Sequence, residues 1–383
     1  MATILEKAHV IKDVKIAEGL QTTPMVLEIL GMEKAMQARY DSLGDLRSGF
    51  GSIVEKKGRF WYYQNGCLYY KNSTNVFEIH GDIYRKWVKL GKEKFGRPDT
   101  NESPCADGTG RFNHFENGTR TIFWHPSTGA NAVEGDIKIR WNDLGWERSY
   151  LGYPSSDESA CADGGRVNSF QHGGIYWWPD SGAVDINDVA VQYTGLMCYE
   201  ESDWDQSSDS DEPYVVIGIV TPFETGAYQT PTFSNVDSGD SIPGLMEIYR
   251  GKPNGIAITV RLMEHDEGDR NKYTEDIAKA MTTAHSAGTL ALGLIPVVGA
   301  GIAAVVGPLI QKFIPDIAKS VNGLFGFGDE EIGRQTIMLT GKEMILAARR
   351  NNLTQRGIGY KFASKNLKRG GSNYKVYFSL VAI

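Results

Sequence analysis

The sequence lacks the short motifs around which many enzymes build their sites. It has no G-x-S-x-G, no H-E-x-x-H and no phosphate-binding P-loop, and its seven histidines are scattered along the chain. Its four cysteines, Cys67, Cys105, Cys161 and Cys198, form no C-x-x-C pair, so neither a zinc site nor a disulfide framework is indicated. We therefore expect a protein that is not an enzyme.

The sequence also lacks a net positive charge. The formal net charge is −7, which argues against nucleic acid as a partner because such a partner requires a basic face. Residues 1–19 carry a charge every few positions and no continuous apolar stretch, so they do not resemble a secretory signal. We expect a protein that is secreted or surface-associated by another route, or one that is cytoplasmic before release.

Length and glycine content indicate several β-rich parts. A chain of 383 residues is expected to form two or three domains, and its 44 glycines exceed the usual share of about 7%. The predicted fold class is α+β, mainly β. We place an N-terminal helical segment at 1–40, three repeats at 41–190, and a β-sandwich at 191–383.

The repeats are visible as recurring residue patterns. A Gly-Arg pair followed by aromatic residues begins at 58, 110 and 165, and an Asn-Gly or Gly-Gly pair follows each one. Each unit therefore predicts two short strands joined by a tight turn, followed by a short helix. Trp87 and Trp141 occupy matching places, and we expect both to be buried.

This pattern resembles the LGFP repeat family, whose tetrapeptide is present here as FGRP at 95–98 and LGYP at 151–154. Members of that family are surface and cell-wall attachment modules, so the resemblance implies that the repeats recognise a cell-envelope glycan. The candidate sugar-stacking residues are Trp124, Trp177 and Trp178. The alternative is that these aromatic residues are core residues, because alternate residues of a strand face inward.

Beyond the repeats, short apolar runs alternate with loops. Runs at 196–199, 215–220, 244–249, 255–263, 335–339 and 374–381 predict strands, and together they are typical of an antiparallel β-sandwich. Acidic loops lie between them, at 200–212, 264–269 and 329–331. Carboxylates from loops that meet in space are the ligands that calcium prefers.

The junctions of these strands resemble C-two domains, the calcium-dependent sandwiches that bind phospholipid. The similar segments are SDSDEPYVVIGI at 208–219, VRLMEHD at 260–266 and DEEIG at 329–333. The resemblance implies calcium as a cofactor and membrane lipid as a partner. The alternative is that these acids are solvated or paired with cations of the protein. The candidate metal ligands are Asp203, Asp205, Asp211, Glu264, Asp266, Asp329 and Glu330.

A charge-free segment is inserted between the last two acidic loops. No Asp, Glu, Lys or Arg occurs from Ala280 to Gln311. A helical face begins after Thr274, and prolines and glycines then favour a helical hairpin at 274–326 over one straight helix. Such a hairpin can be stored against the sandwich, and it can be released at some stage into a membrane or onto a partner; the two states are compatible. The candidate membrane residues are Leu292, Leu294, Ile295, Val297, Val298, Ile302, Val305 and Val306.

Taken together, the sequence favours a non-enzymatic targeting protein, such as a toxin or an injected effector. Its repeats would recognise a glycan, and its sandwich would bring the apolar hairpin to a membrane in a calcium-dependent way. The alternative is a structural or adhesion protein whose hairpin is a core element or forms an oligomer. A lipid- or glycan-cleaving hydrolase is disfavoured by the missing motifs.

Overall fold

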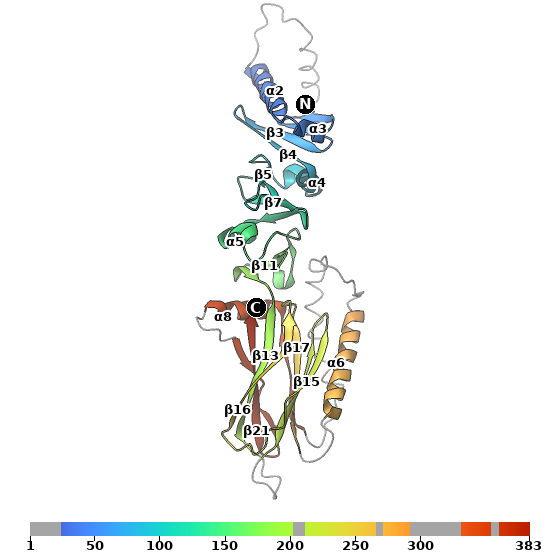
Figure 1. The fold of residues 1–383 in the computed structure, drawn as a ribbon, viewed down its shortest axis with the longest axis vertical. Helices are drawn as coiled ribbons and strands as arrows, with labels where there is room; N and C mark the ends of the chain where they lie inside the picture. The colour runs from blue at the N-terminus through green and yellow to red at the C-terminus, as the bar shows by residue number, and fades with distance from the viewer. Residues whose placement is uncertain (1–23, 202–210, 266–270, 292–330, 354–359) are drawn as a thin grey trace, which may run out of the picture. The chain divides into compact units, whose positions relative to one another are not determined.

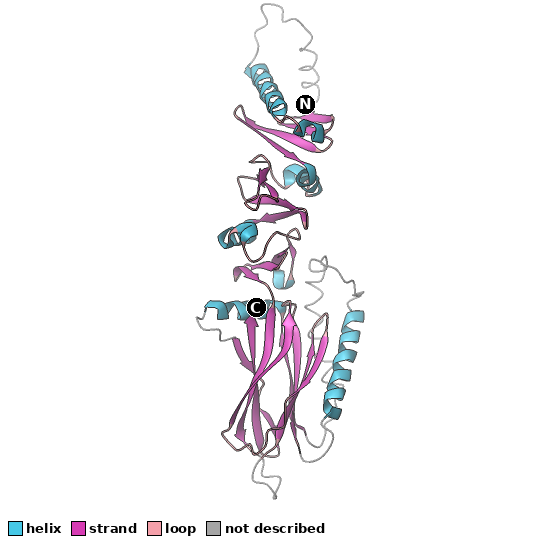
Figure 2. Ribbon diagram, viewed as in Figure 1, coloured by secondary structure: helices cyan, strands magenta, loops and turns pink. Residues whose placement is uncertain are grey.

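The computed structural model describes residues 24–201, 211–265, 271–291, 331–353 and 360–383. Within these ranges the chain is mainly β, with several antiparallel sheets (Figure 1) and a smaller share of helix (Figure 2). The chain divides into two compact units. The first unit holds Met1–Ser149 and Tyr153–Asp157, and the second holds Tyr150–Gly152 and Glu158–Ile383. Each unit is described by itself.

The first unit contains the first two repeats. Its helices are α2 (Pro24–Ser42), α3 (Leu46–Phe50), α4 (Gly81–Lys89) and α5 (Gly135–Leu144), with short 3-10 helices η1 (Lys92–Lys94) and η2 (Trp146–Arg148). Its strands are β1 (Ile53–Lys57), β2 (Phe60–Tyr63), β3 (Gly66–Asn72), β4 (Asn75–His80), β5 (Ser103–Pro104), β6 (Arg111–Phe115), β7 (Arg120–His125) and β8 (Gly129–Glu134). They form two antiparallel sheets in chain order, β1-β2-β3-β4 and β5-β6-β7-β8. Each repeat is therefore a four-stranded sheet, larger than the predicted hairpin.

The expected equivalence of Trp87 and Trp141 is confirmed. Each is the seventh residue of its helix, α4 or α5, and each is 0% exposed. Trp87 packs in one hydrophobic cluster with Phe60 of its own sheet and with Phe115 of the next sheet. Because a single short sheet cannot bury both its faces, the helix of one repeat also covers part of the next.

A glycine precedes each repeat sheet and explains the second position of the FGRP and LGYP motifs. Gly51, Gly96 and Gly152 have φ values of +71°, +140° and +70°, in the region that favours glycine. A Cβ atom at any of them would lie within 3.0 Å of a side chain at the following turn, namely Gln64, Glu116 or Gln171. The first copy, at 50–53, differs from the other two because Ile53 stands where they have proline.

The second unit contains the third repeat and the remainder of the chain. Its helices are α6 (Asn271–Ala291) and α8 (Gly341–Leu353), with a 3-10 turn η3 (Ala162–Gly164). The third-repeat strands are β9 (Ser159–Ala160), β10 (Arg166–Phe170), β11 (Gly173–Trp178) and β12 (Gly182–Ile186). The others are β13 (Val189–Glu200), β14 (Pro213–Val220), β15 (Thr225–Gln229), β16 (Ser241–Gly251), β17 (Ile256–Glu264), β18 (Glu331–Leu339), β19 (Tyr360–Ala363), β20 (Leu367–Arg369) and β21 (Ser372–Ala382).

Strands β13 to β21 form two antiparallel sheets, one ordered β16-β13-β21-β19 with β20 beside β21, the other ordered β15-β14-β17-β18. The first face of β14, represented by Val215 and Ile217, joins β13 and β21 in one hydrophobic cluster. The opposite face, represented by Val216 and Val220, joins a second cluster with α6. Because both faces are buried, β14 reads as a continuous apolar run rather than an alternating one.

Helix α6 lies along β14 and β15 (Figure 1). The predicted helical face is buried there, with Ile277 and Met281 each 0% exposed. The helix begins at Asn271 rather than at Thr274, whose hydroxyl instead donates to Gln229 Oε1 at 2.5 Å. Gly218 lies beneath it, since a Cβ there would approach Met281 to 2.8 Å and Ile277 to 2.9 Å.

Most of the predicted hairpin lies outside the described residues. This applies to 292–326 and to every candidate membrane residue: Leu292, Leu294, Ile295, Val297, Val298, Ile302, Val305 and Val306. Among the helices that the structure describes, none combines the length and apolar character needed to cross a membrane.

Candidate functional site

The repeats place an arginine directly opposite an aromatic residue on neighbouring strands. Arg111 pairs with Trp124, and Arg166 pairs with Trp177. In the first repeat Tyr70 N donates to Arg59 O, and the Arg59 guanidinium lies 5.8 Å from the Tyr70 ring centroid. Residues directly opposite each other in an antiparallel pair have Cβ atoms about 4.5–5.5 Å apart on one face of the sheet. The rings of Trp124 and Trp177 are half-buried.

A carboxylate accompanies the arginine in the second and third repeats. Glu102 and Glu158 each stand one residue before a short strand that pairs beside the arginine strand. Glu158 Oε1 accepts a hydrogen bond from Arg166 Nε at 2.7 Å. The two repeats therefore share a cluster of glutamate, arginine and tryptophan, which we call the Glu-Arg-Trp cluster. Its members are Glu102, Arg111 and Trp124 in the second repeat and Glu158, Arg166 and Trp177 in the third.

Burial changes the charge state of the first of these carboxylates. Burial raises the pKa of Glu102 to about 7, while the positive charge of Arg111 opposes part of that rise. Its neighbour is His80, whose Nε2 lies 3.5 Å from Glu102 Oε2, and burial lowers the pKa of His80. Both shifts disfavour the ion pair that the distance alone would suggest.

Trp178 differs from the other two candidate stacking residues. It is 1% exposed and packs in the hydrophobic cluster that also contains Val184 and Met344. A sugar ring stacks on an exposed aromatic face, and Trp178 presents none in the described structure. Trp178 pairs with Gly182 across neighbouring strands, and His125 pairs with Gly129 in the same way. Trp178 therefore occupies the place of His125 in the preceding repeat.

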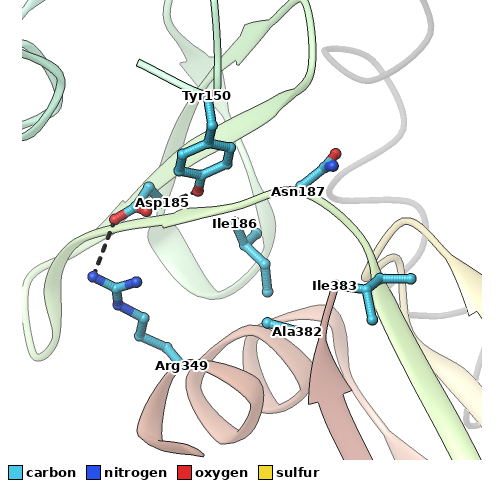
Figure 3. A pocket seen from close by; sticks show the side chains of 7 residues that line it. All are labelled: Tyr150, Asp185, Ile186, Asn187, Arg349, Ala382 and Ile383. Carbon is cyan, nitrogen blue, oxygen red and sulfur yellow. Dashed lines mark hydrogen bonds and ion pairs between the residues drawn. The ribbon is translucent and has the colours of Figure 1, made fainter. Parts of the chain in front are cut away.

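A pocket of about 320 Å³ opens beside the third repeat, entirely within the second unit. It is lined by Tyr150, Asp185, Ile186, Asn187, Arg349, Ala382 and Ile383 (Figure 3). Asp185 is 3% exposed, yet its Oδ2 accepts from the Tyr150 hydroxyl at 2.8 Å and its Oδ1 lies 3.4 Å from Arg349 Nη2. Figure 3 shows Tyr150 and Arg349 on opposite sides of this carboxylate.

The first repeat has a carboxylate at the same strand position. Asp185 pairs with Ile175 and Glu78 pairs with Leu68, which are equivalent places in the two sheets. Glu78 is 4% exposed and accepts from Arg39 of α2, with an Nε–Oε2 distance of 3.1 Å. Burial raises the pKa of Glu78, and Arg39 opposes part of the rise. Both terminal repeats thus use an arginine from a covering helix to neutralise a buried acid.

Two of the candidate calcium ligands are described, and both lie at one end of the same sheet. Pro213 at the start of β14 pairs with Glu264 at the end of β17. Asp211 is 3% exposed, and its Oδ2 accepts from the hydroxyls of Tyr374 at 2.6 Å and Ser372 at 3.2 Å. Glu264 Oε1 accepts from the Glu212 backbone N–H. Both carboxylates therefore already have donors from the protein.

The nearest described acid on β18 has an arginine as its counter-ion. Glu331 is 1% exposed and pairs with Arg261, and Arg334 Nε lies 3.8 Å from its other oxygen. Within the part of the chain that the structure describes, no three His, Cys, Asp or Glu side chains group as a metal site would. The remaining candidate ligands, Asp203, Asp205, Asp266, Asp329 and Glu330, lie outside the described residues.

Comparison with protein families agrees with the repeat geometry. The LGFP repeat model matches residues 95–149 and 151–194. Residues 95–194 are LGFP repeats. Both matches begin at the buried residue before the glycine, Phe95 or Leu151, so the unit starts at the motif rather than at the Gly-Arg pair. No curated protein matches the chain.

Proposed function

We propose that this chain is a non-enzymatic targeting protein whose LGFP repeats bind a cell-envelope glycan. The observation that carries the proposal is the recurrence of the Glu-Arg-Trp cluster at equivalent places in both repeats. A sugar offers hydroxyl groups that donate and accept hydrogen bonds, together with a weakly polar ring face. Carboxylate and guanidinium groups can form hydrogen bonds with the hydroxyls, and the ring face can stack on a half-buried indole.

Recurrence also fits a polymeric ligand. One half-exposed cluster provides little buried area, so a single contact is weak. When two modules on one chain engage one polymer, the second binding event becomes intramolecular and avidity exceeds either affinity. We therefore expect retention on an insoluble glycan polymer and weak binding to its fragments.

The test is co-sedimentation of the full chain with an insoluble cell-wall preparation. Replacing both rings, Trp124→Ala with Trp177→Ala, should weaken retention by at least about tenfold, since even one aromatic stacking contact, as measured for nucleobases, contributes about 1–3 kcal/mol. Arg111→Gln with Arg166→Gln leaves the rings and should weaken retention as well. Phe223→Ala, which replaces a 55% exposed ring outside the repeats, is the control. Wild-type retention of both double variants would contradict the proposal.

We further propose that the second unit contains a β-sandwich of the C-two kind that contacts membrane lipid when calcium is present. Two observations support this step. The pairing of β14 with β17 brings the segments carrying Asp211 and Glu264 to one end of a sheet. Helix α6 also runs directly into the charge-free segment that ends at Gln311. Calcium bound at the acidic end would reduce repulsion from an anionic surface.

Liposome co-sedimentation with calcium, with magnesium and with a chelator tests this second step. Ala303→Asp places a charge in the apolar segment, outside the described residues, and should oppose insertion by about 2.5–3.5 kcal/mol. Thr283→Asp, on the exposed side of α6, should bind lipid as the wild type does. Equal binding by a folded Ala303→Asp protein would show that the segment does not enter the membrane.

A second candidate function is a structural or adhesion protein, and one observation favours it. The apolar face of α6 is already buried against β14, with Ile277 and Met281 fully covered. A helix held this way can serve as a permanent core element. Leakage of dye from liposomes distinguishes the two functions, because only the membrane-active protein should cause it.

A further inference from the structure

We infer that the pocket between the third repeat and α8 is a binding site for a single neutral sugar unit. The inference rests on the proposed function, because it names a subsite for the same class of ligand. The pocket is separate from the Glu-Arg-Trp clusters: its polar residues are Tyr150, Asp185, Asn187 and Arg349 (Figure 3). Its volume of about 320 Å³ is at the lower end of the range of roughly 300–1,000 Å³ for small-ligand sites.

The charged side chains around the pocket are paired with one another, and this pairing favours a neutral ligand. Arg349 faces the carboxylate of Asp185 at 3.4 Å. Lys252, which approaches Asn187 Oδ1 at 3.3 Å, is paired with Asp188 at 2.6 Å. A charged ligand would have to break one of these pairs to gain a partner. A neutral polyol needs only hydrogen-bond donors and acceptors that remain accessible beside them.

Those donors and acceptors are present in complementary types. A guanidinium has five N–H donors in a planar arrangement, and one approach to Asp185 leaves others directed elsewhere. The amide of Asn187 can both donate and accept, and the hydroxyl of Tyr150 donates to Asp185. Neighbouring hydroxyls of a pyranose ring require such alternating partners.

The pocket also has an apolar side for the sugar ring. Tyr150 is 49% exposed although its hydroxyl is anchored to Asp185. A half-exposed ring that is anchored at its hydroxyl loses little rotamer freedom when a ligand packs against it. Ile186, Ala382 and Ile383 supply the remaining apolar lining.

The experiment is saturation-transfer NMR on the full chain with D-glucose, D-mannose and N-acetyl-D-glucosamine, followed by titration with the sugar that gives the strongest signal. Tyr150→Ala and Arg349→Gln should each weaken binding about tenfold or more, as expected for losing a stacking face or a charged hydrogen-bond donor. The matched controls lie in the same unit: Tyr199→Ala replaces a 40% exposed ring, and Arg250→Gln breaks an ion pair on β16. Both controls should bind as the wild type does.

The outcomes separate this inference from the proposed function. If no sugar in the panel binds, or if Tyr150→Ala and Arg349→Gln bind as well as the controls, the pocket is not a sugar site. Retention on the cell-wall polymer is then measured independently and depends on Trp124 and Trp177. Tyr150→Phe, which keeps the ring but removes the hydroxyl, guards against a variant that fails to fold. It should retain part of the affinity if the ring face contributes.

Discussion

The second and third repeats share one sheet plan but are covered by different helices. The second repeat is followed at once by α5, which places Ile137 and Trp141 in the core. The third repeat continues from β12 into β13 without a helix, and α8 from far along the chain packs against it. Met344 and Ile345 of α8 are buried there.

The difference shows what a repeat sheet requires from its neighbour. The sheet needs an apolar surface over its face, and the helix that provides this surface can follow directly in the chain or come from far along it. Where a buried acid occupies the strand, the covering helix must also bring a cation, as α8 brings Arg349 to Asp185. In the second repeat the same strand position holds Ala132, which packs in one cluster with Trp87 of α4, so no cation is required there. A pocket with polar lining consequently accompanies the third repeat.

The largest expected effect comes from removing the covering helix's main side chain. Trp141→Ala should lower the free energy of unfolding by about 3–5 kcal/mol, and Met344→Ala by about 2–5 kcal/mol. Ile139→Ala, on the same helix as Trp141 but 58% exposed, should change it by less than about 0.5 kcal/mol. Denaturant unfolding measures all three. If Trp141→Ala changes the free energy of unfolding as little as Ile139→Ala does, the burial of Trp141 does not stabilise the repeat.

The buried acid Glu102 predicts a pH dependence of stability. Its folded pKa of about 7 exceeds the unfolded value of 4.5, so the folded state binds more protons between these pH values. The contribution of Glu102 to the free energy of unfolding is therefore fully present below pH 4.5. It is lost as pH rises through 7, and the loss is on the order of 2–3 kcal/mol. Glu102→Gln should flatten this part of a plot of unfolding free energy against pH.

The equivalent carboxylate provides the comparison for that measurement. Glu158→Gln removes an acid that accepts from Arg166, and we expect it to leave the pH dependence due to Glu102 in place. An unchanged slope in Glu102→Gln would show that another group titrates in this range.

A graded series at Gly218 tests how closely α6 must approach the sheet. Gly218→Ala already places a Cβ within 3.0 Å of the Met281 and Ile277 side chains, and the larger side chain in Gly218→Leu must displace both of them further. Overpacking of this kind costs about 1–3 kcal/mol. Hydrogen exchange should accelerate in α6 for both variants, and more for leucine than for alanine. Equal protection in both variants would mean that the helix does not depend on this contact.

The smallest effect separates backbone strain from side-chain contact within the third repeat. Gly152 and Gly182 have nearly the same φ, +70° and +69°, so alanine at either adopts an unfavourable conformation at a cost of about 1–2 kcal/mol. Only Gly152 has a neighbour in the way, the side chain of Gln171. Gly152→Ala should therefore be less stable than Gly182→Ala by about 1 kcal/mol.

A double variant checks the cause of that difference. Combining Gly152→Ala with Gln171→Ala removes the neighbour, and the two changes should then be less than additive in their cost. Strict additivity in thermal unfolding would show that Gln171 is not responsible.

The sequence by itself determined the features that depend on local pattern. Turn glycines and aromatic runs located the repeats, and matching places in the repeat pattern identified Trp87 and Trp141 as equivalent. Apolar runs located β13, β14, β16, β17, β18 and β21, with ends that differ by up to seven residues. These features can be predicted because each depends on consecutive residues: a turn depends on the φ preference of its glycine, and a strand on its pattern of apolar residues.

Only the tertiary structure decided which distant residues meet. Nothing in the sequence near Asp185 indicates that Arg349, 164 positions later, supplies its counter-ion, or that α8 replaces a repeat helix. Gly51 depends on a distant residue in the same way, since a Cβ there would meet the side chain of Gln64 across the turn. Burial of a charge is a property of the assembled core, so the choice of partner follows from packing rather than from spacing.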